Sequence, residues 1–279
     1  MRRTEELRGL VEAGLAELPL SDDLCGLEEA VRYTLLGGGK RIRPVLCLAT
    51  GNALGREPEE VLPAALALEL VHTFSLVHDD LPALDDDALR RGQPSAHVRF
   101  GEDVAILAGD ALLAEAFRLA LSYARPAVAR ELADATLGMI GGQYVDVTTD
   151  GELDAAALAE LHALKTGRLL QASVLCAAAV AGLDERARAP WAEVGREVGL
   201  LFQIVDDVLD ATGTAEELGK TPGKDEAAGK VTYVSLHGLE RARALADDVR
   251  ARVRARLETL SADTTVLAEI VETIRERQG

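Results

Sequence analysis

Aromatic residues are scarce in this sequence of 279 residues: four Phe, four Tyr and one Trp together make up 3%. Hydrophobic residues nonetheless make up 48%, and Ala and Leu recur throughout. The core must therefore be built mainly from aliphatic side chains, among which Ala and Leu strongly favour helices. With only 28% charged residues, the composition excludes an intrinsically disordered chain. These features predict an all-α fold.

Cysteine is also rare. The three cysteines, Cys25, Cys47 and Cys176, are widely spaced and form no Cys-x-x-Cys pair. Their odd number and spacing argue against a disulfide framework and give no pattern for a zinc site. We expect all three to be buried free thiols in a reducing cytoplasm.

Long apolar runs are missing. The best run, Ala172 to Leu183, stops at 12 residues, whereas a membrane-spanning helix needs about 20. The segment from Met1 to Gly14 places charges where a signal peptide has its apolar region. We therefore expect a cytoplasmic protein with no membrane span.

Positive charge is in deficit, with 30 basic residues against 47 acidic ones and a net charge of -17. A field of that sign repels nucleic acids and anionic membrane surfaces, so neither is an expected partner. A small anionic substrate is still compatible with this charge, because metal ions and clustered Lys or Arg reverse the sign inside one cleft.

Helical periodicity dominates between clusters of Gly, Pro and Asp. The predicted helices are Val61 to Val77, Glu102 to Ala124, Ala127 to Val145, Ala155 to Ala181 and Trp191 to Leu209. Several are apolar on nearly every face, which indicates helices surrounded by other helices or held in a subunit interface. The one strand-like segment, Lys230 to Leu236, continues as a helix start. No repeat or linker divides the chain, so residues 1–279 are predicted to form a single bundle.

A dense acidic motif ends the first of these apolar helices. Between His78 and Asp87 the chain carries five aspartates, and carboxylates about 4 Å apart repel each other by about 1 kcal/mol in water. Pro82 should bend the turn and bring Asp79 and Asp85 to one metal ion. For an isolated pair of aspartates, a solvated acidic loop would be the more common interpretation.

A second acidic motif, Asp206-Asp207-Val208-Leu209-Asp210, ends another apolar helix. Asp206 and Asp210 are four residues apart and should share one helix face. The helix dipole disfavours aspartate at a helix C-terminus, so two such motifs suggest a function. Carboxylate oxygens suit Mg²⁺, which is usually held by one or two carboxylates together with substrate phosphates.

Basic residues alternate with the acidic motifs along the chain. They are Lys40, Arg41 and Arg43 beside a triple glycine, then Arg90, Arg91, Lys165, Lys220, Lys224 and Lys230. Each alone is more often an exposed loop residue, but Gly-rich backbone, Arg and Lys together bind phosphate oxygens well. The combination predicts a diphosphate held at the mouth of an apolar cavity, where metal ions and cations make it a better leaving group. The implied chemistry is ionisation rather than hydrolysis.

At these residues the chain closely resembles the trans-isoprenyl diphosphate synthases, and specifically the bacterial farnesyl diphosphate synthase type. The resemblance covers nearly the whole chain. The matching segments are Gly38 to Pro44, His72 to Asp80, Arg90 to Gly92, Gly142-Gln143 with Asp146, Lys165 to Gly167, Phe202 to Asp210 and Leu218 to Lys230.

The resemblance implies a fold of ten or more helices around a central cavity, a homodimer, and head-to-tail condensation of isopentenyl diphosphate with dimethylallyl or geranyl diphosphate. It also implies three Mg²⁺ ions held by Asp79, Asp85 and Asp206, with Asp80 and Asp210 as further candidates. The implied allylic diphosphate ligands are Arg90, Lys165, Thr166, Gln203, Lys220 and Lys230, of which Thr166 and Gln203 would lie near the developing cation. The implied isopentenyl diphosphate ligands are Gly39, Lys40, Arg43, His72 and Arg91.

Product length is expected to depend on the cavity wall behind the first motif. Phe74 lies five positions before Asp79, and with Ser75 it would set the depth of the cavity. In the family, an aromatic residue there together with the longer first motif resembles the fifteen-carbon producers. We therefore predict farnesyl diphosphate, with geranyl and geranylgeranyl diphosphate as alternative products.

Two hypotheses from other classes compete with this one. A non-catalytic partner subunit of a prenyl synthase would typically lack the acidic motifs, which are complete here. A di-iron bundle should show Glu-x-x-His pairs on facing helices. A terpene cyclase or a head-to-head synthase would share the Mg²⁺ chemistry but would not need Lys40, Arg43 and His72. Finally, we hypothesise from its Gly and Lys content that the segment from Ala211 to Lys230 closes over the substrates.

Overall fold

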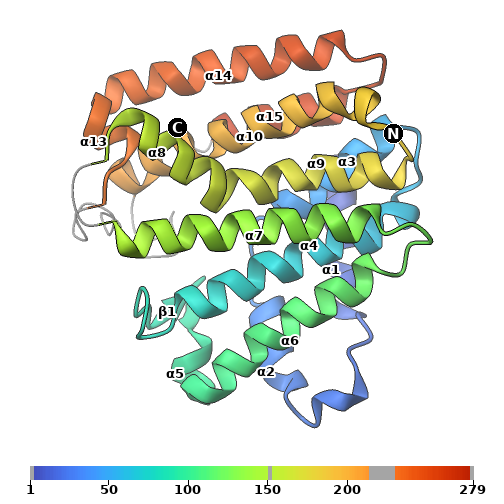
Figure 1. Cartoon of the computed structure of the whole chain (residues 1–279), viewed down its shortest axis with the longest axis vertical. Coiled ribbons are helices and arrows are strands. Elements are labelled where there is room, and N and C mark those ends of the chain that lie inside the picture. Colours follow the sequence, from blue (N-terminus) through green and yellow to red (C-terminus); the bar gives the residue numbers. More distant parts are fainter. Residues whose placement is uncertain (1–2, 150–152, 214–229, 277–279) are drawn as a thin grey trace.

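A computed structural model describes residues 3–149, 153–213 and 230–276 and is built almost wholly from helices (Figure 1). In chain order these are α1 (Thr4–Ala16), η1 (Asp22–Leu24), α2 (Glu28–Leu36), α3 (Ile42–Ala53), α4 (Pro58–Asp79), α5 (Ala96–Phe100), α6 (Glu102–Ala120), α7 (Ala127–Thr148), α8 (Ala155–His162), η2 (Ala163–Gly167), α9 (Arg168–Val180), α10 (Glu185–Thr212), α13 (Tyr233–His237), α14 (Leu239–Thr259) and α15 (Thr265–Glu276). The predicted all-α fold is confirmed.

Helix α4 lies at the centre of the bundle, where it packs against α3, α6 and α9. Pro58 occupies its first turn, and Glu57 and Glu60 form a reciprocal cap there, which satisfies amide groups that have no partner within the helix. By length and composition α4 is apolar enough to cross a bilayer, but 67% of its most apolar window is buried inside the structure. That burial is what the central helix of a bundle requires.

Two local features differ from the sequence prediction. The helix predicted from Ala155 to Ala181 is interrupted by η2, a π-helical turn at Ala163–Gly167, which the uninterrupted apolar pattern does not reveal. A two-residue hairpin, β1 (Leu89–Arg90) with β2 (Gln93–Pro94), follows the first acidic motif. It is too short for an alternating pattern to show.

The cysteines follow the prediction at two positions out of three. Cys47 and Cys176 are buried free thiols, whereas Cys25 is exposed, so its predicted burial was wrong. Cys25 caps the short η1 turn in a left-handed conformation (φ 52°), and the turn holds its side chain on the surface rather than against a helix.

The C-terminal ends of α4, α7 and α10 are directed to the same side of the bundle, beside the β1–β2 hairpin, α8 and α13 (Figure 1). Both acidic motifs lie at these helix ends. The fold therefore gathers segments that are far apart in the sequence around one opening.

Candidate active site

A cavity of about 910 Å³ opens at these helix ends. Its apolar wall includes Phe74, Leu76, Met139, Ile140 and Leu161. Nearly all the site residues predicted from the sequence line it, namely Gly39, Lys40, Arg43, His72, Phe74, Ser75, Asp79, Asp85, Arg90, Arg91, Lys165, Thr166, Gln203, Asp206 and Lys230. Lys220 lies outside the described residues, as does most of the segment from Ala211 to Lys230.

The first acidic motif folds back on the end of α4. The amide of Asp85 donates to the carbonyl oxygen of Asp79 at 2.9 Å, and this turn brings the two residues together as the bend at Pro82 predicts. Burial raises the pKa of Asp79 to about 6, and the nearby Asp85 and Asp80 carboxylates add to the rise. A divalent cation at this point would relieve the repulsion between the carboxylates.

Asp80 has a different environment from Asp79. It is only 2% exposed, and its carboxylate accepts from Nε of Arg90 at 3.0 Å, while Nη2 of Arg90 reaches both Asp80 and Asp87. Asp80 is not among the residues that line the cavity. In this structure Asp80 orients Arg90 and does not face the opening.

In the second acidic motif, too, only some of the carboxylates line the cavity. Asp206 lines the cavity, whereas Asp210 is 5% exposed and is not part of the lining. Asp207 accepts from Nε2 of Gln203 at 2.8 Å and from the amide of Tyr233 at 2.7 Å. Asp207 also lines the cavity, but both of its carboxylate oxygens are already held by these two donors, one of them from α13. The predicted common face of Asp206 and Asp210 does not place both in the cavity.

Two lysines meet at Asp146, a residue of α7. Nζ of Lys165 lies 2.6 Å and Nζ of Lys230 lies 3.3 Å from its Oδ2 atom, and Lys230 is also 3.6 Å from Oδ1 of Asp85. Burial acts to raise the pKa of Asp146, but Lys165 and then Lys230 outweigh it, so the net shift is downward. Asp146 thus stays ionised and holds both ammonium groups at the cavity mouth.

The π-helical turn places Lys165 and Thr166 in the cavity wall. A Cβ atom on Gly142 of α7 would lie 2.4 Å from the amide nitrogen of Lys165, a distance that real atoms do not adopt. Only glycine at 142 therefore allows α7 to approach the turn this closely, and π-helical turns are frequent at functional sites.

A second basic region surrounds His72 on α4. Burial lowers the pKa of His72 well below its usual value, and Arg43 and Arg91 add to the effect, so the imidazole is neutral. Burial also lowers the pKa of Arg43 to about 10, which leaves this guanidinium charged at neutral pH. Its centre lies 5.8 Å from the ring of Phe202.

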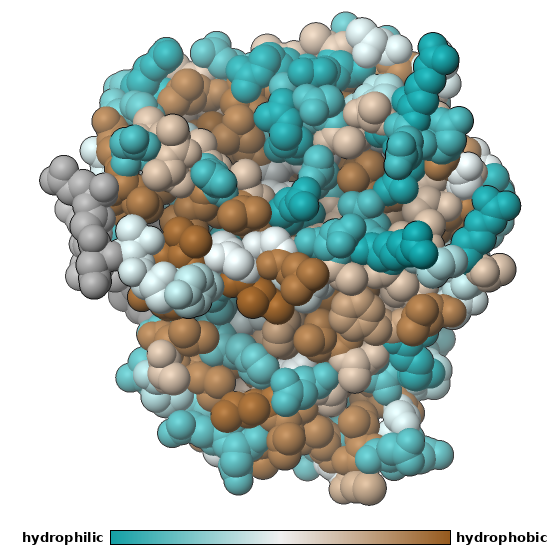
Figure 2. All heavy atoms as spheres, in the orientation of Figure 1, coloured by the Kyte–Doolittle hydropathy of each residue, from teal (hydrophilic) through white to brown (hydrophobic). Residues whose placement is uncertain are grey.

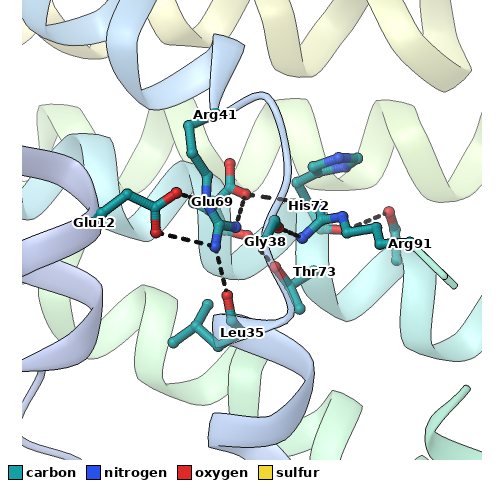
Figure 3. Close-up of polar contacts among 9 residues, drawn as sticks. Glu12, Leu35, Gly38, Arg41, Glu69, His72, Thr73 and Arg91 are labelled. Carbon is teal, nitrogen blue, oxygen red and sulfur yellow. Dashed lines mark hydrogen bonds and ion pairs between the residues drawn. The ribbon is translucent and has the colours of Figure 1, made fainter. Parts of the chain in front are cut away.

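Two residues of the cavity, Glu69 and Gln143, received no role in the sequence analysis. Glu69, only 1% exposed, contacts Arg41 and Arg91 (Figure 3). Its signal was visible as an acidic residue inside the otherwise apolar segment from Val61 to Val77. Gln143 lines the cavity, and neither polar atom of its side chain has a hydrogen-bond partner among the described residues.

The carboxylates fit a metal ion that is shared with a phosphate ligand. Within the described ranges, no group of three or more His, Cys, Asp or Glu side chains could hold a metal by itself. Mg²⁺ commonly takes only one or two carboxylates and completes its six positions with water and substrate phosphates. Asp79 and Asp85 on one side and Asp206 on another match that requirement.

Comparisons with known proteins agree with this geometry. The family model described as polyprenyl synthetase matches residues 25–274. The chain is 45% identical over 261 residues to the heterodimeric geranylgeranyl pyrophosphate synthase large subunit 1 of Arabidopsis thaliana chloroplasts, covering 88% of this chain and 70% of that one. A crystal structure of a geranylgeranyl pyrophosphate synthase superposes with a TM-score of 0.93 at 26% identity over 100% of both chains. A Helicobacter pylori geranyltransferase, complexed with magnesium and isoprenyl diphosphate, has a TM-score of 0.82 at 32% identity, covering 98% of this chain and 95% of that one.

Proposed function

Because this chain belongs to the polyprenyl synthetase family and is a prenyltransferase, we propose that it condenses isopentenyl diphosphate head-to-tail with an allylic diphosphate. The observation that carries the proposal is a single cavity with carboxylates and cations at its mouth and aliphatic side chains along its wall. An allylic diphosphate has matching chemistry, since its head is a polyanion and its tail is a hydrocarbon.

The allylic diphosphate would bind between the two acidic motifs. Asp79, Asp85 and Asp206 would hold Mg²⁺, and the family resemblance suggests three ions. Bound Mg²⁺ would neutralise the departing diphosphate and so favour ionisation of the allylic C–O bond. Lys165 and Lys230, which Asp146 already holds at the mouth, would contact the same diphosphate. Arg90, oriented by Asp80, would add a further cation.

Isopentenyl diphosphate would bind in the second basic region. Lys40 and Arg43 from the start of α3, with Arg91 from the hairpin, supply cations, while neutral His72 supplies a hydrogen-bonding ring without adding charge. Gly39 would let the backbone approach a phosphate closely.

The carbocation would form in the apolar part of the cavity. Thr166 and Gln203 both line the cavity. Their side-chain oxygens would present partial negative charge to the cation, while the aliphatic wall would exclude water that would quench it. The departing diphosphate would accept the final proton.

We propose geranylgeranyl diphosphate as the main product. The sequence analysis favours farnesyl diphosphate, but two of the three relatives compared above are named geranylgeranyl pyrophosphate synthases, which supports the longer alternative. Farnesyl diphosphate remains the second candidate because of one observation: Phe74 lines the cavity and packs edge-on against His78, with ring centroids 4.9 Å apart. Phe74 and Ser75 would then limit the chain length.

We further propose that the chain acts as a homodimer in the cytoplasm, without nucleic acid or membrane partners. The homodimer is supported by exposed apolar side chains on α6 and α7, including Ile106, Leu107, Leu137 and Ile140. The Arabidopsis relative is named as a subunit of a heterodimer, so pairing with a different chain is the competing arrangement.

The test is incubation with isopentenyl diphosphate and dimethylallyl, geranyl or farnesyl diphosphate, with Mg²⁺ or with excess chelator, followed by separation of products by length. We expect twenty-carbon product only with Mg²⁺. A fifteen-carbon end product would support the proposed condensation but would show that the product is farnesyl rather than geranylgeranyl diphosphate. If the folded protein gives no condensation with any allylic substrate, the proposed function is wrong and a non-catalytic partner subunit becomes the better explanation.

A further inference from the structure

One buried carboxylate, that of Glu69, lies where two loops meet beside the second basic region (Figure 3). Its Oε1 atom is 2.6 Å from Nη1 of Arg41 and 3.9 Å from Nη2 of Arg91. Arg41 ends the glycine-rich loop, whereas Arg91 forms the turn of the hairpin. Glu69 itself is on α4, one helical turn before His72, so it joins the rigid central helix to both loops.

Arg41 anchors the C-terminal end of the glycine-rich loop. It is 2% exposed and adopts a left-handed backbone conformation (φ 50°) at the start of α3. Besides Glu69, its guanidinium donates to Oε1 of Glu12 at 2.9 Å and to the carbonyl oxygen of Leu35 at 2.8 Å. These contacts join the end of the loop to α1, α2 and α4. Among the three partners of Arg41, only Glu69 also contacts Arg91 and lines the cavity, so it alone joins the end of this loop to the hairpin.

Arg91, from the hairpin, anchors the same loop at its glycines. Its Nη1 group donates to the carbonyl oxygen of Gly38, and a Cβ atom on Gly39 would lie 2.7 Å from the Arg91 Cζ atom. The guanidinium therefore lies flat against the glycine backbone. Arg91 lies in the hairpin turn with a left-handed backbone (φ 53°), and its hydrogen bond to Gly38 joins this turn to the glycine-rich loop.

The negative charge of Glu69 also offsets repulsion among the neighbouring arginines. Arg41 acts to lower the pKa of Arg91, and Arg91 acts to lower the pKa of Arg43, whereas Glu69 acts to raise the pKa of all three guanidinium groups. Without this carboxylate the guanidinium groups would separate, and the loop and hairpin would move apart with them. Like charges that are partly buried repel strongly because screening by water is weak.

We propose that Glu69 is a positioning residue for the isopentenyl diphosphate site: it preorganises Lys40, Arg43 and Arg91 through Arg41 and through charge balance, without touching the substrate. The inference rests on the proposed function. It runs against simple electrostatics, since removing a negative charge from beside an anion site should otherwise strengthen anion binding.

The test compares Glu69→Gln with Glu12→Gln, which removes a partner of Arg41 that does not contact Arg91. Initial rates are measured at varied concentrations of isopentenyl diphosphate with saturating allylic substrate. They are then measured at varied concentrations of the allylic substrate with saturating isopentenyl diphosphate. We expect Glu69→Gln to raise KM for isopentenyl diphosphate at least tenfold and to leave KM for the allylic diphosphate within twofold. Glu12→Gln should leave both KM values within twofold.

Three results would overturn the inference: an unchanged or lower KM for isopentenyl diphosphate in Glu69→Gln, an equal rise in both KM values, or the same rise in Glu12→Gln. If Glu69→Gln does not fold by circular dichroism, Glu69→Asp keeps the charge but shortens its reach, and KM for isopentenyl diphosphate should rise at least threefold. A folded Glu69→Asp with the original KM also overturns it. Failure of the proposed function is separate, because then the unmodified chain forms no product.

Discussion

At the scale of single residues, Gln143 combines a structural cost with a place in the cavity. Its side-chain amide is buried and has no hydrogen-bond partner among the described residues, which costs about 1–3 kcal/mol relative to a satisfied amide. A bound ligand can satisfy a buried amide of this kind. Its position in the lining, on α7 three residues before Asp146, would let it form a hydrogen bond with the proposed allylic substrate.

Gln143→Met keeps the volume of the side chain and removes its polar atoms. We expect the free energy of unfolding to stay equal or to rise by about 1 kcal/mol, because an unsatisfied amide is lost. We expect kcat/KM for the allylic substrate to fall about tenfold, the usual worth of one hydrogen bond. Urea unfolding and steady-state kinetics check the two expectations.

Gln171 is the matched control. Its Nε2 atom donates to the carbonyl oxygen of Ala192 at 3.1 Å, between α9 and α10, and it is not part of the cavity lining. Gln171→Met should therefore lower the free energy of unfolding by about 1 kcal/mol and leave kcat/KM unchanged. Equal behaviour of the two variants would show that Gln143 is an ordinary packing residue.

Phe74 provides the residue-scale prediction for product length. It lies five residues, or about 7.5 Å along a helix, before Asp79. Replacing it by Ala removes the ring from the cavity wall and should lengthen the main product by at least one five-carbon unit, as measured by product chromatography. Leu76→Ala, in the same helix and the same lining, serves as the control for general loosening. An unchanged product profile in Phe74→Ala would remove this residue from the explanation.

At this scale the sequence predicted most of the residues that line the cavity. It did not predict which of two neighbouring carboxylates faces the cavity and which contacts other protein groups. Asp79 and Asp206 were predicted to lie together because the motifs and the alternating charge indicate a metal and diphosphate site, and both line the cavity. The inward roles of Asp80 and Glu69 were missed because they depend on partners that only the tertiary structure supplies. Arg90 and Arg41 reach them from loops 10 and 28 residues away, and no local pattern records such a pairing.

At the scale of elements, the approach of α7 to the π-helical turn determines where Lys165 lies. Gly142→Ala would force a Cβ atom to 2.4 Å from the Lys165 backbone. We expect it to lower the free energy of unfolding by about 1–3 kcal/mol through overpacking and to reduce kcat, because the lysine moves with the turn. Differential scanning calorimetry and kinetics provide the two measurements.

The adjacent glycine offers a control within the same helix. A Cβ atom on Gly141 would meet nothing within 4 Å, so Gly141→Ala should stabilise the protein by about 0.5–1 kcal/mol through the lower entropy of the unfolded chain. Its kcat should not change. A loss of stability at Gly141 as large as at Gly142 would contradict the close-approach explanation.

The pairing of α14 with α15 predicts a pH dependence. A hydrogen bond from Arg275 outweighs the effect of burial and lowers the pKa of Asp247 below its usual value. The Oδ1 atom of Asp247 lies 2.7 Å from Nε of Arg275. A depressed carboxylate pKa contributes stability above the unfolded pKa and loses it as pH falls through the folded value. Asp247→Asn should thus cost about 0.5 kcal/mol at pH 7, as expected for an exposed pair, and nothing near pH 2.

Urea unfolding of the variant and the unmodified chain at both pH values measures this difference. Asp248→Asn is the control, because Asp248 forms no ion pair within the part of the chain that the structure describes. A cost for Asp247→Asn that is the same at both pH values would show that the charge of Asp247 is not its source.

Element boundaries show what periodicity predicts and what it leaves out. The helix predicted from Val61 to Val77 is α4, extended by one turn through its capped start, and the segment from Ala127 to Val145 is α7. The break at Ala163–Gly167 was missed because a π-helical turn adds one residue without interrupting the apolar pattern. The π-helical turn is a change in the backbone hydrogen bonding of the helix, which the amino-acid composition does not reveal.

At the scale of the whole molecule, hydrophobic side chains gather on the face formed by α6 and α7 (Figure 2). On α7 the exposed residues Leu137, Ile140, Tyr144 and Val147 are spaced by three or four positions and form one stripe. A net charge of -17 would keep two copies apart unless such an apolar face offset the repulsion. Ile140, Tyr144 and Val147 also line the cavity, so the same stripe reaches the candidate active site.

Leu137 is 68% exposed and is not part of the cavity lining, which makes it the position for testing the proposed dimer. Leu137→Glu would place a charge in the stripe that the proposed dimer buries, and an unpaired buried charge is strongly unfavourable. We expect the molar mass from light scattering to fall from that of a dimer to that of a monomer. Leu236→Glu, an equivalent change at an exposed leucine of α13, should leave the dimer intact.

Activity should follow the oligomeric state, because the stripe beside Leu137 continues into residues of the cavity wall. We expect Leu137→Glu to lose at least tenfold in kcat/KM and to regain activity as protein concentration rises, since mass action restores the dimer. An unmodified chain that is already monomeric and active would refute the proposed homodimer. A monomeric Leu137→Glu with full activity would instead keep the dimer but show that the cavity is complete within one chain.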